Sequence, residues 1–369
     1  MPEYASNSPQ HVSVRDFPVL ELEEHMVAHA SYKAVVIHGP GRSTLERLPL
    51  PQAGPKDVLI EVAYVGICAT DIEILKGELG YYKNGMGKYP ITPGHEFSGT
   101  IARVGQQANG MAVGMPVVVE CIQTCRQCDQ CRDENWIGCK ERKEVGVLGR
   151  DGAYAEYVLV PAEFVHLLSA ETDLKTAALC EPAAVAIKGI RRLGRVLGPE
   201  NRTRCAVVGA GPIGNLCAQI LALKGHEVQA FDQITSRLAC FQGSTIKTAS
   251  EMTGLEEFDV VVEATGSSQV LQSILEKTRP GCVLLLLGLP YGAQPFNFET
   301  VVAYDKMVIG SVGSAAVDFA EAIGMLPRLE LAPFMQKTFP LEQYQDAWDA
   351  FRTRRFLKVM IAATHVERA

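Results

Sequence analysis

Apolar and polar residues alternate over short distances in the first half of the chain. From residue 32 to about residue 165, short runs rich in β-branched residues are separated by turns that contain glycine and proline; the clearest runs are residues 58–65, 100–104 and 117–119. Runs of this length and composition are typical of strands in a half-buried sheet. The pattern therefore predicts an all-β, barrel-like lobe.

The pattern changes near residue 183. Strand-like and helical stretches then alternate through residues 204–209, 212–224, 227–232, 258–264, 271–277 and 282–288. Such alternation indicates a parallel sheet with helices on both faces. After residue 310 the pattern is mixed, with a helical stretch at 341–351 and a strand-like run at 357–362 that we expect to rejoin the first lobe.

These patterns predict an α/β chain with two domains. We expect residues 1–30 to form an N-terminal extension, residues 31–182 and 311–369 to form the β lobe, and residues 183–310 to form a doubly wound, Rossmann-type domain. A length of 369 residues agrees with two domains of about 150 residues each.

Composition and charge narrow the choice of partner. The chain is 47% hydrophobic and 21% charged, with a net charge of −7, which disfavours nucleic acid or an anionic membrane as the main partner and favours a small-molecule substrate. Residues 1–30 lack the apolar core of a secretion signal, and residues 282–289 are too short to span a bilayer. We expect a cytoplasmic protein.

Four cysteines lie at the spacing C-x2-C-x2-C-x7-C, namely Cys125, Cys128, Cys131 and Cys139. Four thiolates suit one tetrahedral Zn²⁺ and leave no open position for substrate, so this site predicts a structural zinc in a lobe at about residues 121–140. Surface cysteines or disulfides are the alternative, which a cytoplasmic setting disfavours.

A glycine-rich turn follows the apolar strand at 205–208. It reads Gly209-Ala210-Gly211-Pro212-Ile213-Gly214 and opens a helix, which is the context of a dinucleotide-binding turn. Asp232 lies at the end of the next strand, where a carboxylate accepts hydrogen bonds from the adenosine ribose and repels a 2′-phosphate, so NAD is favoured over NADP. Arg237 leaves the alternative open, because its guanidinium could pair with a 2′-phosphate.

Two further motifs carry metal-ligand residue types. Residues 66–71 contain Cys68, and residues 93–99 contain His95. Alone, each is more often a packed or surface residue than a ligand.

The order of the motifs resembles that of the zinc-dependent medium-chain dehydrogenases, from residue 32 to about residue 362. The matching features are Cys68-x-Thr70-Asp71, Gly94-His95-Glu96, the four-cysteine lobe, Glu181-Pro182 and the glycine turn. Glu181 stands where classical alcohol dehydrogenases have their third zinc ligand, a cysteine, so the chain is most similar to the sorbitol (polyol) dehydrogenase branch. The resemblance implies a GroES-like domain that holds two zinc ions and a Rossmann domain that binds NAD.

The resemblance also implies roles for single residues. Cys68 and His95 would bind a catalytic zinc, with Glu96 or Glu181 and water completing the shell. Thr70 would hydrogen-bond the substrate oxygen and start a proton relay, whose continuation is open because Glu73 stands where many relatives have histidine. We expect Asp71 to orient the ligands and Cys180 to be a buried apolar residue.

In the cofactor domain, the segments 264–266 and 288–290 resemble loops that pass the cofactor ribose and nicotinamide, which gives contact roles to Thr265, Gly288 and Leu289. The segment 310–314, with Val312 and Gly313, resembles the strand end whose backbone meets the nicotinamide carboxamide. Glycine-rich turns of any doubly wound sheet are the alternative at each place.

From the resemblance we expect reversible oxidation of a secondary alcohol, on a polyol, sugar or cyclitol, by a homodimer or homotetramer. Residues 77–88, which include Tyr81 and Tyr82, either line the substrate pocket or form an exposed loop. A threonine-like amino alcohol or an aminocyclitol is the alternative substrate. A non-catalytic redox sensor or scaffold is the alternative from another class, and would hold only the four-cysteine zinc.

Overall fold

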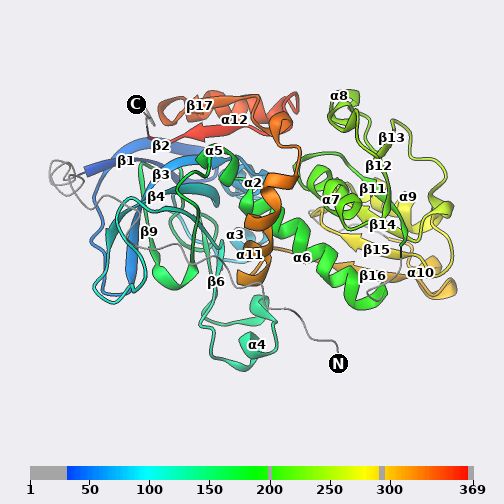
Figure 1. Cartoon of the computed structure of the whole chain (residues 1–369), viewed down its shortest axis with the longest axis horizontal. Coiled ribbons are helices and arrows are strands. Elements are labelled where there is room, and N and C mark those ends of the chain that lie inside the picture. The colour runs from blue at the N-terminus through cyan, green and yellow to red at the C-terminus, as the bar shows by residue number, and fades with distance from the viewer. Residues whose placement is uncertain (1–30, 198–201, 291–295, 365–369) are drawn as a thin grey trace.

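The computed structural model describes residues 31–197, 202–290 and 296–364. A β-rich part and a parallel-sheet part lie side by side, with helices packed between them (Figure 1). The predicted extension at residues 1–30 lies outside the described residues. No helix in the described part of the chain is long and apolar enough to cross a membrane.

The β-rich part is built around one seven-stranded sheet. Its central strand β3 (Asp57–Gly66) pairs with β4 and β9 and, through an antiparallel ladder, with β18 from the end of the chain. The predicted return of the chain terminus to the first lobe is thereby confirmed. The other strands of this sheet are β4 (Glu96–Val104), β5 (Pro116–Val119), β9 (Tyr157–Pro161), β10 (Val165–Leu167), β17 (Thr338–Pro340) and β18 (Met360–Ala362).

Smaller elements complete this part. A hairpin joins β1 (Ser31–Gly39) to β2 (Arg42–Pro49), and a three-stranded sheet contains β6 (Ile122–Gln123), β7 (Lys143–Val145) and β8 (Gly149–Arg150). The helices here are α2 (Ala69–Lys76), α3 (Gly80–Lys83), α4 (Asp129–Arg132), α5 (Leu174–Ala177) and α12 (Tyr344–Arg352).

The second part is a six-stranded parallel sheet with the order β13-β12-β11-β14-β15-β16. The order reverses at β11, as in a doubly wound Rossmann sheet, so the predicted fold class is confirmed. The strands are β11 (Arg204–Val208), β12 (Glu227–Phe231), β13 (Lys247–Ala249), β14 (Val260–Glu263), β15 (Val283–Leu286) and β16 (Met307–Gly310). The helices that connect them are α7 (Pro212–Leu223), α8 (Thr235–Leu238), α9 (Ser268–Lys277) and α10 (Glu299–Ala303).

Two helices join the parts. α6 (Cys180–Leu197) and α11 (Ala316–Met325) pack against each other between the two sheets (Figure 1). Their apolar faces enter a core that contains residues from both sheets, for example Val118 and Val207. Small buried residues of α6, such as Ala183 and Ala186, allow this close packing. The sequence pattern did not predict α11, because residues 316–325 carry no run that separates them from their mixed surroundings.

Candidate active site

Asp71 links the two loops that carry the predicted metal ligands. It lies in the first turn of α2 and its side chain is completely buried. Its carboxylate accepts hydrogen bonds from the backbone N–H of Cys68 (2.9 Å), the backbone N–H of Gly94 (3.3 Å) and the Tyr154 hydroxyl (2.9 Å). A buried carboxylate with three donors holds its neighbours rigidly, so Asp71 fixes the Cys68 loop against the Gly94-His95 loop.

Cys68, His95 and Glu96 come together in space. The ligand atoms of all three lie within 4.8 Å of one another, and His95 and Glu96 are 6% and 3% exposed. His95 Nδ1 lies 3.6 Å from Asp71 Oδ1, just beyond hydrogen-bond distance, and has no hydrogen-bond partner among the described residues. A thiolate, an imidazole and a carboxylate form a donor set that fits catalytic zinc with an open fourth position.

Glu96 is paired with a buried lysine that the sequence reasoning missed. Lys358 Nζ, on the strand-like run before β18, forms an ion pair with Glu96 Oε2, and both side chains are about fully buried (2% and 3% exposed). A Cβ added to Gly66 would lie 2.5 Å from Glu96 Oε2 and 2.7 Å from Lys358 Cε, so glycine makes room for this pair. The signal in the sequence was a single lysine between the apolar residues Leu357 and Val359.

Glu181 lies near this cluster but outside it. It is in the first turn of α6 and 7% exposed, yet the group of mutually close ligand atoms holds Glu96 and not Glu181. Burial raises the pKa of Glu181 to about 7, opposed by His95 and reinforced by Glu96. A carboxyl held neutral by burial is one that a bound cation would ionise.

The other residues that the sequence singled out in this part of the chain make ordinary packing and hydrogen-bond contacts. Cys180 is completely buried, its thiol lies 3.9 Å from the Phe319 carbonyl, and burial raises its pKa. Thr70 is half-buried, with Oγ1 3.7 Å from Cys68 Sγ. Tyr81 and Tyr82 pack inward, because the Tyr81 hydroxyl donates to Glu144 Oε1 (3.1 Å) and the Tyr82 hydroxyl donates to the Val147 carbonyl (3.1 Å).

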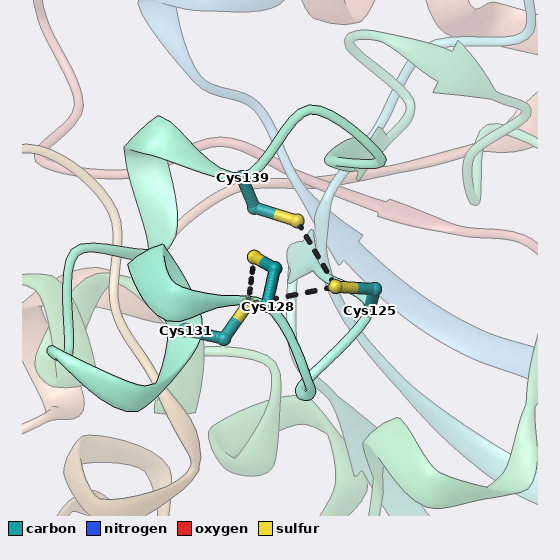
Figure 2. Close-up of side chains that lie close together, drawn as sticks. All are labelled: Cys125, Cys128, Cys131 and Cys139. Atoms are coloured by element: carbon teal, nitrogen blue, oxygen red, sulfur yellow. Dashed lines mark hydrogen bonds between the residues drawn. The ribbon is translucent and has the colours of Figure 1, made fainter.

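The four cysteines of the predicted structural site also come together (Figure 2). Their sulfurs are 3.9 Å apart for Cys125 and Cys131, 3.5 Å for Cys128 and Cys131, and 3.6 Å for Cys139 and Cys125. A tetrahedron with Zn–S bonds of about 2.3 Å has edges of about 3.8 Å. All four thiols are free of disulfides, so the donors and their spacing fit Zn²⁺.

The glycine turn has the geometry that close approach of a phosphate requires. Gly209 has φ +95°, and a Cβ on Gly214 would lie 1.7 Å from the Gly209 carbonyl oxygen. Gly211 is the N-cap of α7 with Pro212 and Ile213 in its first turn, and a Cβ there would meet only Arg237 Nη1 at 3.8 Å. The helix N-terminus is therefore open to a pyrophosphate.

Asp232 lies beside this turn, just after β12. Its Oδ2 accepts a hydrogen bond from the Ala210 N–H (2.8 Å), and its Oδ1 accepts one from the Ile234 N–H (2.8 Å). Arg237 Nη1 lies 3.3 Å from Asp232 Oδ2, while Arg237 Nε is buried without a hydrogen-bond partner among the described residues. The two residues on which the choice between NAD and NADP was expected to rest are thus in direct contact.

Glu263, at the end of β14, organises the next two loops and was not predicted. Its Oε1 accepts hydrogen bonds from the N–H groups of Thr265 (2.7 Å) and Gly266 (3.0 Å). A Cβ on Gly288 would lie 2.2 Å from the Gly266 nitrogen, so the two loops touch. Thr265, Gly288 and Leu289 are held at one edge of the sheet, and Leu289 is 48% exposed there.

The segment after β16 packs against the β-rich part of the molecule. Gly313 has φ +62°, and a Cβ there would lie 2.1 Å from Ile122 Cδ1. Cys121, beside Ile122, is buried, and Val312, next to Gly313, is 44% exposed. The strand end expected to meet the nicotinamide therefore packs against the β-rich part at Ile122.

A β lobe with two zinc-type ligand clusters, joined to a doubly wound sheet with a phosphate-binding turn, defines a zinc-dependent oxidoreductase that uses a nicotinamide dinucleotide. Residues 54–170 match the alcohol dehydrogenase GroES-like domain family, and residues 174–362 match the glucose dehydrogenase C-terminus family. The chain belongs to the zinc-dependent medium-chain dehydrogenases, as the resemblance implied, and is a zinc-dependent alcohol oxidoreductase.

Several similar proteins are named as dehydrogenases of sugar alcohols or their phosphates. D-arabinitol dehydrogenase 1 of Uromyces fabae is 28% identical over 90% of this chain and 97% of its own length. Sorbitol dehydrogenase of Halalkalibacterium halodurans is 28% identical over 88% of this chain and 96% of its own. Among solved structures, galactitol-1-phosphate dehydrogenase from Escherichia coli aligns with a TM-score of 0.78 at 25% identity, covering 89% of this chain and 99% of that chain.

Proposed function

We propose that the protein oxidises a secondary alcohol of a polyol, sugar or cyclitol with NAD, reversibly, at a zinc held by Cys68, His95 and Glu96. The observation that carries this proposal is the cluster of Cys68, His95 and Glu96, whose ligand atoms lie within 4.8 Å of one another in the β-rich part. The nicotinamide-type strand end at Gly313 packs on Ile122 of the same part, which supports hydride transfer between a substrate at this cluster and the cofactor.

The bound groups would supply Lewis acidity from zinc and a hydride acceptor from the nicotinamide ring. The protein's own residues would do the rest. Thr70 Oγ1 would hydrogen-bond the substrate hydroxyl and take part in removing its proton. Asp71 would keep Cys68 and His95 in place through its three hydrogen bonds, and Glu181 would approach from α6 as an alternative ligand.

Lys358 would influence how Glu96 binds the metal, because it is paired with the same carboxylate. In the described structure the Lys358 ammonium is paired with Glu96 Oε2, and Glu96 also belongs to the candidate metal cluster. Because a carboxylate has two oxygens, Glu96 would be able to hold the metal through one oxygen while Lys358 stays paired with the other, and Lys358 would fix the orientation of this ligand.

NAD preference follows from Asp232. Its carboxylate lies at the end of β12 beside the glycine turn, where it would repel a 2′-phosphate. The Arg237 charge that could attract that phosphate is already paired with Asp232 at 3.3 Å, which supports NAD over NADP.

The polyol class is supported by the names of the similar proteins and by Glu181, which stands where classical alcohol dehydrogenases have a cysteine as their third zinc ligand. Fewer thiolates leave a more positive metal, which suits a substrate that chelates through adjacent oxygens. A threonine-like amino alcohol or an aminocyclitol is the second candidate, because L-threonine 3-dehydrogenase of Legionella pneumophila is 29% identical over 86% of this chain and 95% of its own length.

The proposal also covers the domain boundaries, the cellular location and the oligomeric state. The domain boundaries at residues 182/183 and 310/311 are part of the proposal, as is a cytoplasmic location. A homodimer or homotetramer is supported by β16, the edge strand of the parallel sheet. Exposed apolar side chains lie on and around it, at Val302 (81% exposed), Met307 (47%) and Val308 (38%), and such an edge is typical of pairing with a second copy.

The test is NADH formation by zinc-replete protein with linear polyols, aldoses, inositols, aminocyclitols and amino alcohols, each paired with an NADP⁺ control. We expect turnover with a polyhydroxylated alcohol and NAD⁺, and none in Cys68→Ser at unchanged circular dichroism. Equal turnover by Cys68→Ser would refute the zinc assignment. Turnover on amino alcohols alone would replace the polyol class, and preference for NADP⁺ would refute the Asp232 argument.

A further inference from the structure

Lys188 is a buried lysine whose contacts are unusual. It lies on the inner face of α6, is 7% exposed, and its Nζ donates a hydrogen bond to the backbone carbonyl of Val312 at 2.7 Å. Burial lowers the pKa of Lys188 to about 8, opposed by Asp318. Buried lysines are normally paired with a carboxylate, but the Asp318 carboxylate is hydrogen-bonded to Arg191 at 2.9 and 3.2 Å. The ammonium is thus directed at a main-chain carbonyl.

The other side of Lys188 faces the structural-zinc lobe. Lys188 Nζ lies 5.7 Å from the ring centroid of Trp136, a residue between the zinc-site cysteines Cys131 and Cys139. An ammonium over an indole face is attracted electrostatically. Glu134 of the same lobe pairs with Arg195 of α6 at 2.6 Å. The lobe is therefore docked on α6, where Trp136 confines the lysine.

The Val312 carbonyl, which accepts the hydrogen bond from Lys188, belongs to a segment that also contains hydroxyl groups without hydrogen-bond partners. The hydroxyls of Ser311 and Ser314 are buried and have no hydrogen-bond partner among the described residues. Gly313 is in the left-handed region and is packed against Ile122. The hydrogen bond from Lys188 fixes the Val312 carbonyl. This restricts the rotation of the peptide units on either side of Val312 and so sets the direction of their N–H and C=O groups.

We propose that Lys188 is a positioning residue for the nicotinamide. Its ammonium holds the Val312 carbonyl, Trp136 holds the ammonium, and the structural-zinc lobe thereby keeps segment 311–314 in the conformation that receives the carboxamide. The inference rests on the proposed function, in which that segment meets the nicotinamide. It gives the four-cysteine zinc a task in cofactor binding besides stabilising its own lobe.

The test compares binding of two probes to zinc-loaded protein without any alcohol substrate. One probe is NADH or NADPH, whichever wild type binds more tightly, followed by its fluorescence; the other is the matching ADP-ribose, which lacks nicotinamide. Lys188→Met should raise the Kd of the dinucleotide about tenfold, the effect of one hydrogen bond to a charged group, and leave the Kd of ADP-ribose unchanged. Lys188→Arg, which keeps a charged donor, should restore part of the loss.

Two further variants separate positioning from general stability. Trp136→Ala should weaken dinucleotide binding selectively and less strongly, and it carries the test if Lys188→Met does not fold. Arg192→Met, at an exposed position of the same helix, should change neither Kd. Equal loss for both probes, or no loss, would overturn the inference. Wild type that binds ADP-ribose as tightly as the dinucleotide would refute nicotinamide contact itself, and so the proposed function.

Discussion

Replacing Lys358 by methionine removes one half of a buried ion pair. Its ammonium and the Glu96 carboxylate are 2% and 3% exposed, so neither charge is solvated by water. Burial lowers the pKa of Lys358, but Glu96 and Cys68 outweigh this effect and raise it, so the lysine is charged across the physiological range. Leaving a buried charge without its partner costs about 3–5 kcal/mol. We expect about 3 kcal/mol, because a bound zinc would offset part of the charge on Glu96.

The assay is urea denaturation of zinc-replete protein followed by circular dichroism. Lys224→Met is the matched control, since Lys224 and Glu321 form a surface pair at 2.8 Å with side chains 38% and 35% exposed, and such pairs contribute about 0–1 kcal/mol. Glu96→Gln combined with Lys358→Met should recover much of the stability, because it removes the orphaned charge. If Lys358→Met destabilises no more than Lys224→Met, the pairing described here is wrong.

Two other variants test the raised pKa of Glu181 and the structural zinc at the four cysteines. The pKa of Glu181 is raised from 4.5 to about 7 in the folded protein, so the folded state binds that proton more tightly than the unfolded state. Zinc-free protein should therefore lose about 3 kcal/mol of stability between pH 4.5 and pH 7 relative to Glu181→Gln, and parallel pH profiles for the two proteins would contradict this. Cys128→Ser should lower the melting temperature clearly while Cys240→Ser, at a half-buried cysteine outside both clusters, should not; equal melting curves would disprove the structural-zinc assignment.

The sequence predicted the parts of this molecule that depend on local pattern. The parallel strands, the glycine turn and the cysteine spacing each follow from neighbouring residues, and β11 and α7 begin at the residues expected, Arg204 and Pro212. Pairs that meet only through the fold were not predictable. Lys358 is 262 positions from Glu96, and Lys188 is 124 positions from Val312.

The roles of single residues needed the family resemblance as well. Cys68 and His95 are ordinary residues by spacing alone, and their proximity depends on the buried carboxylate of Asp71, whose hydrogen bonds join two loops. Glu263 gave a weak signal as a charge at the end of an apolar strand, but the N–H groups it binds could not be inferred from its position. Tertiary contacts of this kind decide the site, whereas local periodicity decides the fold.

We propose that Cys68, His95 and Glu96 hold a second, catalytic zinc in addition to the four-cysteine zinc. The most direct measurement is the zinc content per chain, by mass spectrometry of exhaustively dialysed protein, for wild type and a Cys68→Ala/His95→Ala double variant. We predict two zinc ions per chain in wild type and one in the double variant. One zinc in both proteins would contradict the claim and leave a nucleotide-binding protein with only a structural metal.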